Sequence, residues 1–255
     1  MQMKLKSLLL ETFLHWENQE ENRAHFKALL QQQQPNQWDL IVLPEMFSTG
    51  FTMNTAVSEE LVNGEFPSVA LMKEESERLN AAIVGSLSVR EEGKAYNRLF
   101  FVRPSREVST YNKRHLFSFA GEHKHYEAGG EQCLVEWRGW NILLNICYDL
   151  RFPVWTRNEV IKGIPKFDLM IYVANWPSVR AEVWKTLLKA RAIENVAYVI
   201  GVNRIGEDGN GHAYSGDSAI VNFRGELTQE LSLEDLNAFR EKFSALNDAD
   251  SFQLK

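Results

Sequence analysis

Short, uninterrupted apolar runs are the feature that most limits how this 255-residue chain can fold. The clearest are "LIVL" at 40–43 and "LMIYVA" at 169–174. Such runs suit strands that are buried on both faces, because a half-exposed strand would alternate apolar with polar residues. We therefore expect sheets that are covered on both sides by other elements.

Segments with helical periodicity lie between several of these runs. In 17–33, for example, Phe26, Leu29 and Leu30 share one face of an amphipathic helix. Further helices are predicted at 68–80, 153–163, 181–195 and 231–248. Strands are predicted at 4–13, 38–47, 81–90, 95–104, 107–117, 140–152, 167–176, 197–206 and 217–226. The pattern indicates one α/β domain over residues 1–255, with a helical tail from about 231, but leaves open whether it holds one sheet or two.

Composition narrows the possible partners and the compartment. The formal net charge of -6 argues against nucleic acid or an anionic membrane as the main partner. No apolar run reaches the roughly 18 residues of a membrane span, and "MQMKLKSLLLETFLHW" lacks a signal-peptide cleavage site. The two cysteines, Cys133 and Cys147, lack the C-x-x-C spacing of a structural zinc site. We therefore expect a cytoplasmic protein with reduced thiols.

Cys147 stands where an apolar run meets a charged turn. It follows "NILLNI" and precedes Tyr148, Asp149 and Arg151, so it is expected where a strand leaves the sheet. On a sharp turn of this kind, as in a nucleophile elbow, the side chain is exposed and the next N–H is free. A helix that begins near Pro153 would also favour a thiolate. The alternative is that Cys147 is a small buried hydrophobic residue, as most free cysteines are.

Two charged residues lie at other predicted strand ends. Glu45 follows "LIVLP", and Lys113 lies in "STYNKRHLF". In a shared pocket, Glu45 would accept the thiol proton and Lys113 would stabilise an oxyanion, whereas apart they would be solvated loop residues. His115, His123 and His125 crowd the loop after Lys113, so a Cys/His pair also stays open. The "HKH" run is a weak metal signal because no third ligand follows at a known spacing.

Together these stretches resemble the nitrilase (carbon–nitrogen hydrolase) superfamily. The catalytic trio of that superfamily is glutamate, lysine and cysteine in that order, matched here by "LIVLPEMFSTGF", "YNKRHLF" and "LLNICYDLRFPVW". With "DLMIYVANWP" and "LLKARAIENVAYVIGVNRIGEDGNGHAYSGDSAIV", the resemblance extends from about Leu5 to Glu226. The block "NWP…W…LLKARAIEN" and the "GFTMN" segment are similar to the Nit2-like omega-amidase branch. The chain departs from the pattern at "VNFRGE", where members have a proline near the last strand.

The resemblance implies a fold, an assembly and a reaction. The implied fold is a four-layer αββα sandwich of two stacked mixed sheets flanked by helices. The implied assembly is a homodimer, with the helix after Cys147 and the helix ending "ARAIEN" at its surface. The implied reaction hydrolyses the terminal amide of 2-oxoglutaramate or 2-oxosuccinamate through a cysteine thioester. Neither cofactor nor metal is implied.

The resemblance also implies residue roles. Glu45 would be the base, and Lys113 and the backbone N–H of Tyr148 would bind the oxyanion. Members have a second glutamate between the lysine and the cysteine, for which Glu122 is the best match and Glu127 the alternative.

Other residues near the trio are expected to shape the pocket. Residues expected in the pocket walls are Phe117, Tyr126, Asn175 and Trp176. Arg151 would either bind a distal substrate carboxylate or pair with Asp149 or another carboxylate and brace the turn, and we favour bracing.

Two other functions stay open. One is hydrolysis of a different carbon–nitrogen bond in an N-carbamoyl amine, an aliphatic amide or a nitrile, because such enzymes share the trio. The other is a non-catalytic binding subunit, which loss of Glu45, Lys113 or Cys147 would favour. All three residues are present.

Overall fold

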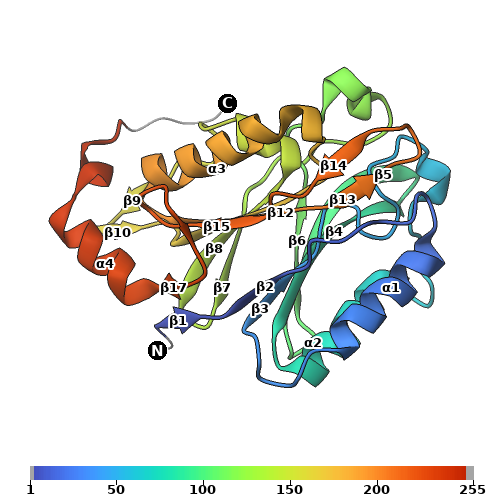
Figure 1. Cartoon of the computed structure of the whole chain (residues 1–255), viewed down its shortest axis with the longest axis horizontal. Coiled ribbons are helices and arrows are strands. Elements are labelled where there is room, and N and C mark those ends of the chain that lie inside the picture. The colour runs from blue at the N-terminus through green and yellow to red at the C-terminus, as the bar shows by residue number, and fades with distance from the viewer. Residues whose placement is uncertain (1–2, 251–255) are drawn as a thin grey trace.

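Two sheets lie face to face between layers of helices (Figure 1). The computed structural model describes residues 3–250. Helices α1 (Gln19–Gln31) and α2 (Pro67–Leu79) cover the outer face of one sheet, and α3 (Ala181–Asn195) covers the outer face of the other. This is the predicted αββα sandwich, and it answers the question that periodicity left open: there are two stacked sheets.

The first sheet combines parallel and antiparallel pairing, in the order β2-β3-β4-β5-β6. Its strands are β2 (Ser7–Leu9), β3 (Leu40–Val42), β4 (Ala82–Glu91), β5 (Lys94–Val102) and β6 (Val108–Asn112). Strands β2, β3 and β4 are parallel, whereas β4, β5 and β6 form an antiparallel meander. The predicted strand pair across Pro104–Ser105 is confirmed as β5 and β6.

The second sheet has the order β16-β15-β12-β11-β8-β7. Its strands are β7 (Cys133–Trp137), β8 (Trp140–Ile146), β11 (Leu169–Ala174), β12 (Tyr198–Asn203), β15 (Ala219–Val221) and β16 (Leu227–Thr228). The central strands β8, β11 and β12 are parallel, so their carboxyl ends share one edge. Residues that follow β8 and β11 therefore emerge side by side.

Alternate residues of the central strands pack into different layers. Leu40 and Val42 of β3 belong to the core between the sheets, whereas Ile41 packs with the residues of α1 and α2. In the other sheet, Leu143 of β8 packs with Trp184 of α3. Leu40, Ile41 and Val42 are all apolar because both faces of β3 are covered.

The predicted helix at 153–163 is wrong. A five-residue 3-10 helix, η4 (Cys147–Arg151), leads into turns and then a hairpin of β9 (Val160–Ile161) and β10 (Ile164–Pro165). Lys162 and Gly163 form the hairpin turn with φ of 51° and 81°, the left-handed conformations that such two-residue turns need. Asn158 also ties this segment to α3, because its backbone N–H donates to Asn195 Oδ1 at 2.6 Å.

The two ends of the chain also differ from the prediction. The predicted strand at 4–13 is divided, because β1 (Lys4–Leu5) pairs with β17 (Leu231–Ser232) and β2 pairs with β3. The tail after β17 forms α4 (Leu233–Lys242) and η6 (Ala245–Asp248) rather than one helix. Ser232 caps α4 by accepting the Asp235 N–H at 3.2 Å.

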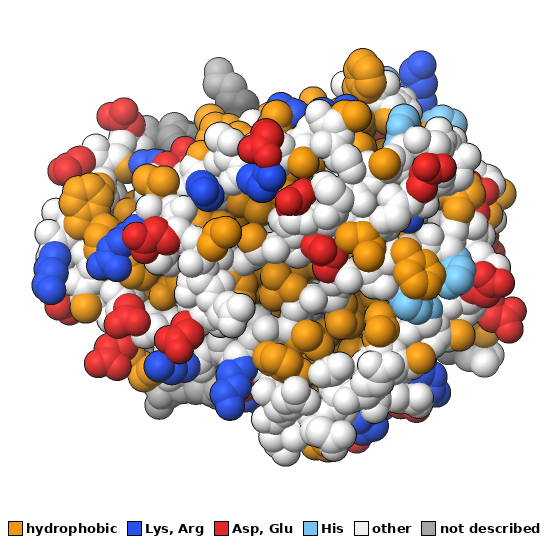
Figure 2. Space-filling model, in the orientation of Figure 1, with side chains coloured by type: hydrophobic (Ala, Val, Ile, Leu, Met, Phe, Trp, Pro, Cys, Tyr) orange, Lys and Arg blue, Asp and Glu red, His pale blue; other side chains and the backbone are white. Residues whose placement is uncertain are grey.

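The remaining elements are short, and the surface is of mixed charge. These elements are η1 (Thr55–Val57), η2 (Ser118–Ala120), η3 (Glu122–Lys124), η5 (Ser178–Arg180), β13 (Ile205–Glu207) and β14 (Ala213–Ser215). On the face shown in Figure 2, acidic and basic side chains are interspersed. None of the helices within residues 3–250 combines the length and the apolar character of a membrane span.

Candidate active site

Glu45, Lys113 and Glu122 form a buried ionic cluster between the sheets. Lys113 Nζ lies 2.9 Å from Glu45 Oε1 and 3.0 Å from each carboxylate oxygen of Glu122. Of the two candidates for the second glutamate, Glu122 lies inside the cluster, whereas Glu127 is exposed. Because charges leave water at a high free-energy cost, a buried cluster of this kind persists only when its members are paired.

The second sheet fixes Glu45 from across the interface. The backbone N–H of Asn175, directly after β11, donates to Glu45 Oε2 at 2.8 Å. Its side-chain Nδ2 donates to the Glu45 carbonyl oxygen at 2.6 Å. These two bonds hold both the backbone and the carboxylate of Glu45, so the position of the acid depends on the packing of both sheets.

Cys147 occupies a strained turn at the end of β8. Its φ is 43°, a left-handed conformation that non-glycine residues adopt only when the surrounding structure enforces it. The turn is held by Asp149 Oδ2, which accepts the Ile146 N–H at 3.0 Å. The thiol lines a cavity of about 720 Å³ together with Lys113. The structure thus brings Glu45, Lys113 and Cys147 to one place.

The thiol is held as the protonated form. Burial and the nearby Glu45 carboxylate raise the pKa of the Cys147 thiol well above its ordinary value, despite the opposing effect of Lys113. The expectation that a helix N-terminus would favour a thiolate is wrong, because Cys147 itself begins a 3-10 helix of only five residues. Attack by sulfur therefore requires a base that removes the proton during the step.

The charges of the cluster act on one another. Burial alone would lower the pKa of Lys113, but the carboxylates of Glu122 and Glu45 outweigh burial and raise it above the ordinary value. Burial raises the pKa of Glu122, while Lys113 opposes that shift. The lysine is therefore firmly cationic, and Glu122 is the carboxyl that takes up a proton more readily than usual.

Asp149 joins the lysine loop to the cysteine turn. It accepts hydrogen bonds from the Tyr111 hydroxyl at 2.8 Å and from His115 through the backbone N–H at 3.0 Å and the ring Nδ1 at 2.8 Å. Tyr111 and His115 flank Lys113 in the chain. Because His115 is bound to Asp149, it is Glu45 rather than a histidine that lies against the Cys147 thiol.

The predicted pairing of Arg151 with Asp149 is wrong, because Asp149 is occupied by Tyr111, His115 and the Ile146 N–H. The Arg151 guanidinium instead lies 5.2 Å from the centre of the Trp176 ring, at the wall of the cavity.

Three of the four predicted wall residues line the cavity. Phe117, Asn175 and Trp176 do so, whereas Tyr126 does not. The Tyr126 hydroxyl donates to the Thr52 carbonyl oxygen at 2.8 Å and lies 3.0 Å from Ser88 Oγ, so both of its partners belong to the protein. The expectation that Tyr126 forms a wall is thus corrected to a supporting place behind the site.

Sequence reasoning missed the cavity walls contributed by distant segments. These include Trp16, Phe119, Arg180, Asp208 and His212. No local pattern marks them, because they come from loops that the fold brings together.

The sequence analysis did not single out Asn97, although its position in the sequence gave a signal that could have identified it. It lies in β5 on the same face as Leu99 and Phe101, which enter the core between the sheets, so it is a polar residue at a buried position. It contacts the carboxylates of Glu45 and Glu122.

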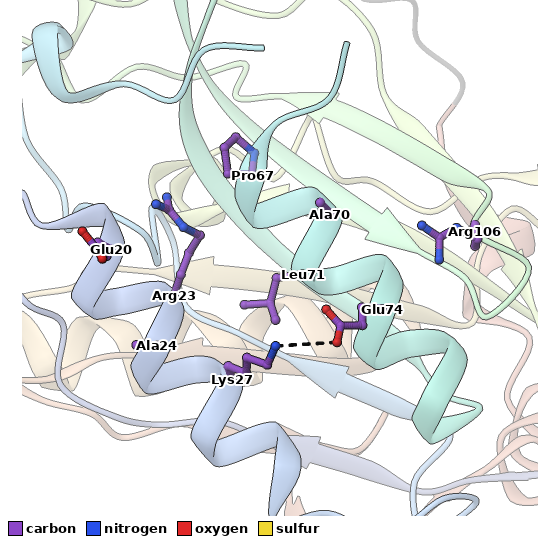
Figure 3. A pocket seen from close by; sticks show the side chains of 9 residues that line it. All are labelled: Glu20, Arg23, Ala24, Lys27, Pro67, Ala70, Leu71, Glu74 and Arg106. Atoms are coloured by element: carbon purple, nitrogen blue, oxygen red, sulfur yellow. Dashed lines mark ion pairs between the residues drawn. The ribbon is translucent and has the colours of Figure 1, made fainter. Parts of the chain in front are cut away.

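A second cavity, of about 580 Å³, lies between α1 and α2 (Figure 3). Lys27 and Glu74 face each other across it at 3.6 Å, and Arg23 lies 3.6 Å from buried Glu59. Its lining residues include no cysteine, serine or histidine. In contrast to this cavity, the Cys147 cavity brings a thiol close to a carboxylate.

Both cysteines are free thiols. Cys133 begins β7, a strand that sequence reasoning missed, and is half-buried there. Within residues 3–250, no group of three or more His, Cys, Asp and Glu side chains is arranged to hold a metal ion.

Comparisons with known proteins agree with this geometry. The carbon–nitrogen hydrolase family profile matches residues 2–237. The omega-amidase YafV of Yersinia enterocolitica is 48% identical over 98% of both chains, and the 2-oxoglutaramate amidase of Bacillus subtilis is 33% identical over 75% of this chain and 73% of its own. A solved structure from Xanthomonas campestris, a CN-hydrolase superfamily protein with an arsenic adduct in its active site, superposes with a TM-score of 0.95 at 42% identity over all of both chains. The chain belongs to the carbon–nitrogen hydrolase family.

Proposed function

We propose that this protein is an omega-amidase that hydrolyses the terminal amide of 2-oxoglutaramate or 2-oxosuccinamate to the 2-oxo acid and ammonia. The observation that carries the proposal is the buried Glu45–Lys113–Glu122 cluster, which lies beside the Cys147 thiol at the wall of an open cavity. The omega-amidase and 2-oxoglutaramate amidase relatives support the substrate class.

Formation of the thioester begins with a coupled proton transfer. Cys147 Sγ attacks the amide carbon while Glu45 accepts the thiol proton. Lys113 Nζ and the backbone N–H of Tyr148 donate hydrogen bonds to the oxyanion that forms. Protonated Glu45 then delivers the proton to the amide nitrogen, the carbon–nitrogen bond breaks, and ammonia leaves behind a thioester.

Hydrolysis of the thioester reverses these roles. Glu45 accepts a proton from water, whose oxygen attacks the thioester carbon. The second oxyanion collapses, the carbon–sulfur bond breaks, and the proton returns to Sγ. Glu122 orients Lys113 throughout, because both of its carboxylate oxygens accept from the ammonium.

Two arginines are suited to bind the substrate carboxylate. The Arg151 guanidinium lies over Trp176, and the Arg180 guanidinium lies 5.6 Å from the centre of the Phe117 ring. Both residues line the cavity, and each guanidinium faces an aromatic ring there rather than a carboxylate. A 2-oxo acid would supply the missing anion, and an arginine fork binds a carboxylate in two-point geometry.

We also propose that the chain folds as one domain, pairs as a homodimer and acts in the cytoplasm. One core extends from Leu5 to Leu246, which supports a single domain. Phe119, Val179 and Ile193 are 87%, 85% and 52% exposed, as expected of apolar residues that a second copy covers. Sedimentation velocity at micromolar concentration tests the dimer, and a monomer throughout would contradict it.

Ammonia release across a substrate panel tests the reaction. The panel holds 2-oxoglutaramate, glutamine, asparagine, an N-carbamoyl amine and a simple nitrile. Preference for the 2-oxo acid amide supports the proposal, whereas preference for another member would assign a different carbon–nitrogen bond. Labelling with iodoacetamide separates an enzyme from a binding subunit, because only an active-site Cys147 would be protected by substrate.

Lys113→Ala tests the oxyanion assignment. The variant should lose at least about 10²-fold in kcat, because one oxyanion donor and the cation of the cluster are both removed. Lys27→Ala is the matched control, since it removes an ion-paired lysine on the outer face. Wild-type kcat in Lys113→Ala would show that this role is wrong.

A further inference from the structure

Asn97 reaches the two carboxylates that Lys113 binds. It is fully buried in β5, and its Nδ2 donates to Glu45 Oε1 at 2.8 Å and to Glu122 Oε1 at 3.2 Å. The ammonium of Lys113 contacts the same two oxygens. Asn97 is not part of the cavity lining, so it acts on the carboxylates rather than on a bound substrate.

A relay from the neighbouring strand fixes the orientation of the Asn97 amide. The Met46 N–H donates to Ser86 Oγ at 2.9 Å, which leaves the hydroxyl proton of Ser86 free to donate to Asn97 Oδ1, also at 2.9 Å. With Oδ1 held by Ser86, the Nδ2 group must face the carboxylates. The relay starts one residue after Glu45, so the backbone that carries the acid also aims the amide that binds it.

We propose that Asn97 is a positioning residue for the hydrolysis: it holds the Glu45 and Glu122 carboxylates in one arrangement around Lys113 and keeps Glu45 available as the proton acceptor. This inference rests on the proposed role of Glu45 as the base.

The physical reason is that two like charges share a single cation. Hydrogen bonds donated to ionised carboxylates favour the ionised form, and the amide supplies them without adding charge. Without Nδ2, each carboxylate loses one donor and keeps Lys113 and one backbone N–H, from Asn175 for Glu45 and from Phe117 for Glu122, so the doubly ionised pair becomes less stable. The other titratable groups that face the pair are Lys113, Cys147, Tyr126 and Tyr214.

Asn97→Leu and Asn97→Val remove both N–H donors without adding charge. The expected result is a fall in kcat of about 10- to 100-fold, a KM within about threefold of wild type, and an acidic limb of the pH–rate profile that moves upward by about half a unit or more. Asn158→Leu is the matched control: Asn158 is equally buried but binds Asn195 and the Phe167 backbone, so this variant should lose stability and keep the wild-type profile.

Alkylation of Cys147 by iodoacetamide gives a second readout that needs no substrate. Its rate against pH should shift in both Asn97 variants, and coincidence of both variants with wild type would overturn the proposal. If Asn97→Leu does not fold, the smaller Asn97→Val, whose β-branched side chain suits strand β5, decides. Two other results would instead count against the proposed function itself. One is a Glu45→Gln variant with the wild-type alkylation profile, and the other is a wild-type protein that releases no ammonia from the amide substrates.

Discussion

Replacing Asp149 with asparagine should weaken both the fold and the reaction. The carboxylate accepts four hydrogen bonds: Ile146 N–H and Tyr111 O–H on Oδ2, and two from His115 on Oδ1. An asparagine has one acceptor oxygen, which would remain with His115 because both of its donors are fixed. The new NH2 group would then face two donors in a buried site.

The magnitude follows from what each donor can do. The Tyr111 oxygen already accepts from the Arg114 N–H and the Trp155 Nε1–H, so it cannot also accept from the new NH2 group, and its own proton loses an acceptor. The Ile146 N–H cannot move, and an unpaired buried donor costs about 1–3 kcal/mol. Together with the lost charge-assisted bonds, we expect about 2–4 kcal/mol of destabilisation, which for a chain of this size lowers Tm by very roughly 5–15 °C. Because Ile146 immediately precedes Cys147, kcat should fall by about 10- to 100-fold.

Thermal unfolding and steady-state ammonia release measure the two effects. Asp168→Asn is the control, since Asp168 is also buried and accepts from the Asn141 N–H at 3.0 Å and Arg240 at 2.6 Å, but holds α4 rather than the cysteine turn. The control should lose stability and keep kcat. If Asp149→Asn loses stability to the same degree and also keeps kcat, the link between the two loops does not position the thiol. If Asp149→Asn loses no stability, the four hydrogen bonds to the Asp149 carboxylate do not stabilise the fold as we expect.

Two further variants test individual charges. Burial raises the pKa of Glu122, so the folded state binds a proton that the unfolded chain releases near pH 4.5, and stability should fall as pH rises through that window. Glu122→Gln should abolish this fall, and urea unfolding at pH 5 and pH 8 that declines equally in both proteins would contradict the assignment. Arg151→Met should raise KM for 2-oxoglutaramate about tenfold or more and leave a neutral aliphatic amide within about twofold, because only the first substrate offers a carboxylate. An equal rise for both substrates would mean that Arg151 shapes the cavity rather than binding an anion.

The parts of the fold that the sequence predicts are those with a strong local signal. "LIVL" and "LMIYVA" are apolar at every position, which is why β3 and β11 are found where expected. Segment 153–163 shows the limit of this reasoning. Its apolar spacing fits a helix, but Lys162-Gly163 closes a hairpin and Asn158 binds α3, and neither effect is visible in the periodicity.

The residues of the site also fall into those with a local sequence signal and those that only the fold brings together. Glu45, Lys113 and Cys147 are predictable because each follows a strand. The contact between Asn175 and Glu45 joins positions 130 residues apart, and only the stacking of the sheets creates it. The partner of Arg151 was mispredicted because Asp149 is its near neighbour in sequence, while Tyr111 and His115 reach Asp149 from another strand end. Tertiary contacts, rather than local spacing, decide which charges meet.

The protonated state of the thiol has a chemical consequence for the whole site. A stored thiolate could attack an amide, but the departing nitrogen would still need a proton from elsewhere. In the proposed reaction, burial and Glu45 would keep the proton on Cys147 until a carbonyl is in reach, and Glu45 would then hold that same proton beside the leaving group. The Lys113 ammonium, whose pKa is raised by the two carboxylates, would stabilise the oxyanion that forms when sulfur attacks the carbonyl carbon. In this proposal, an arrangement that disfavours the resting thiolate would therefore supply both the base and the acid that amide cleavage needs.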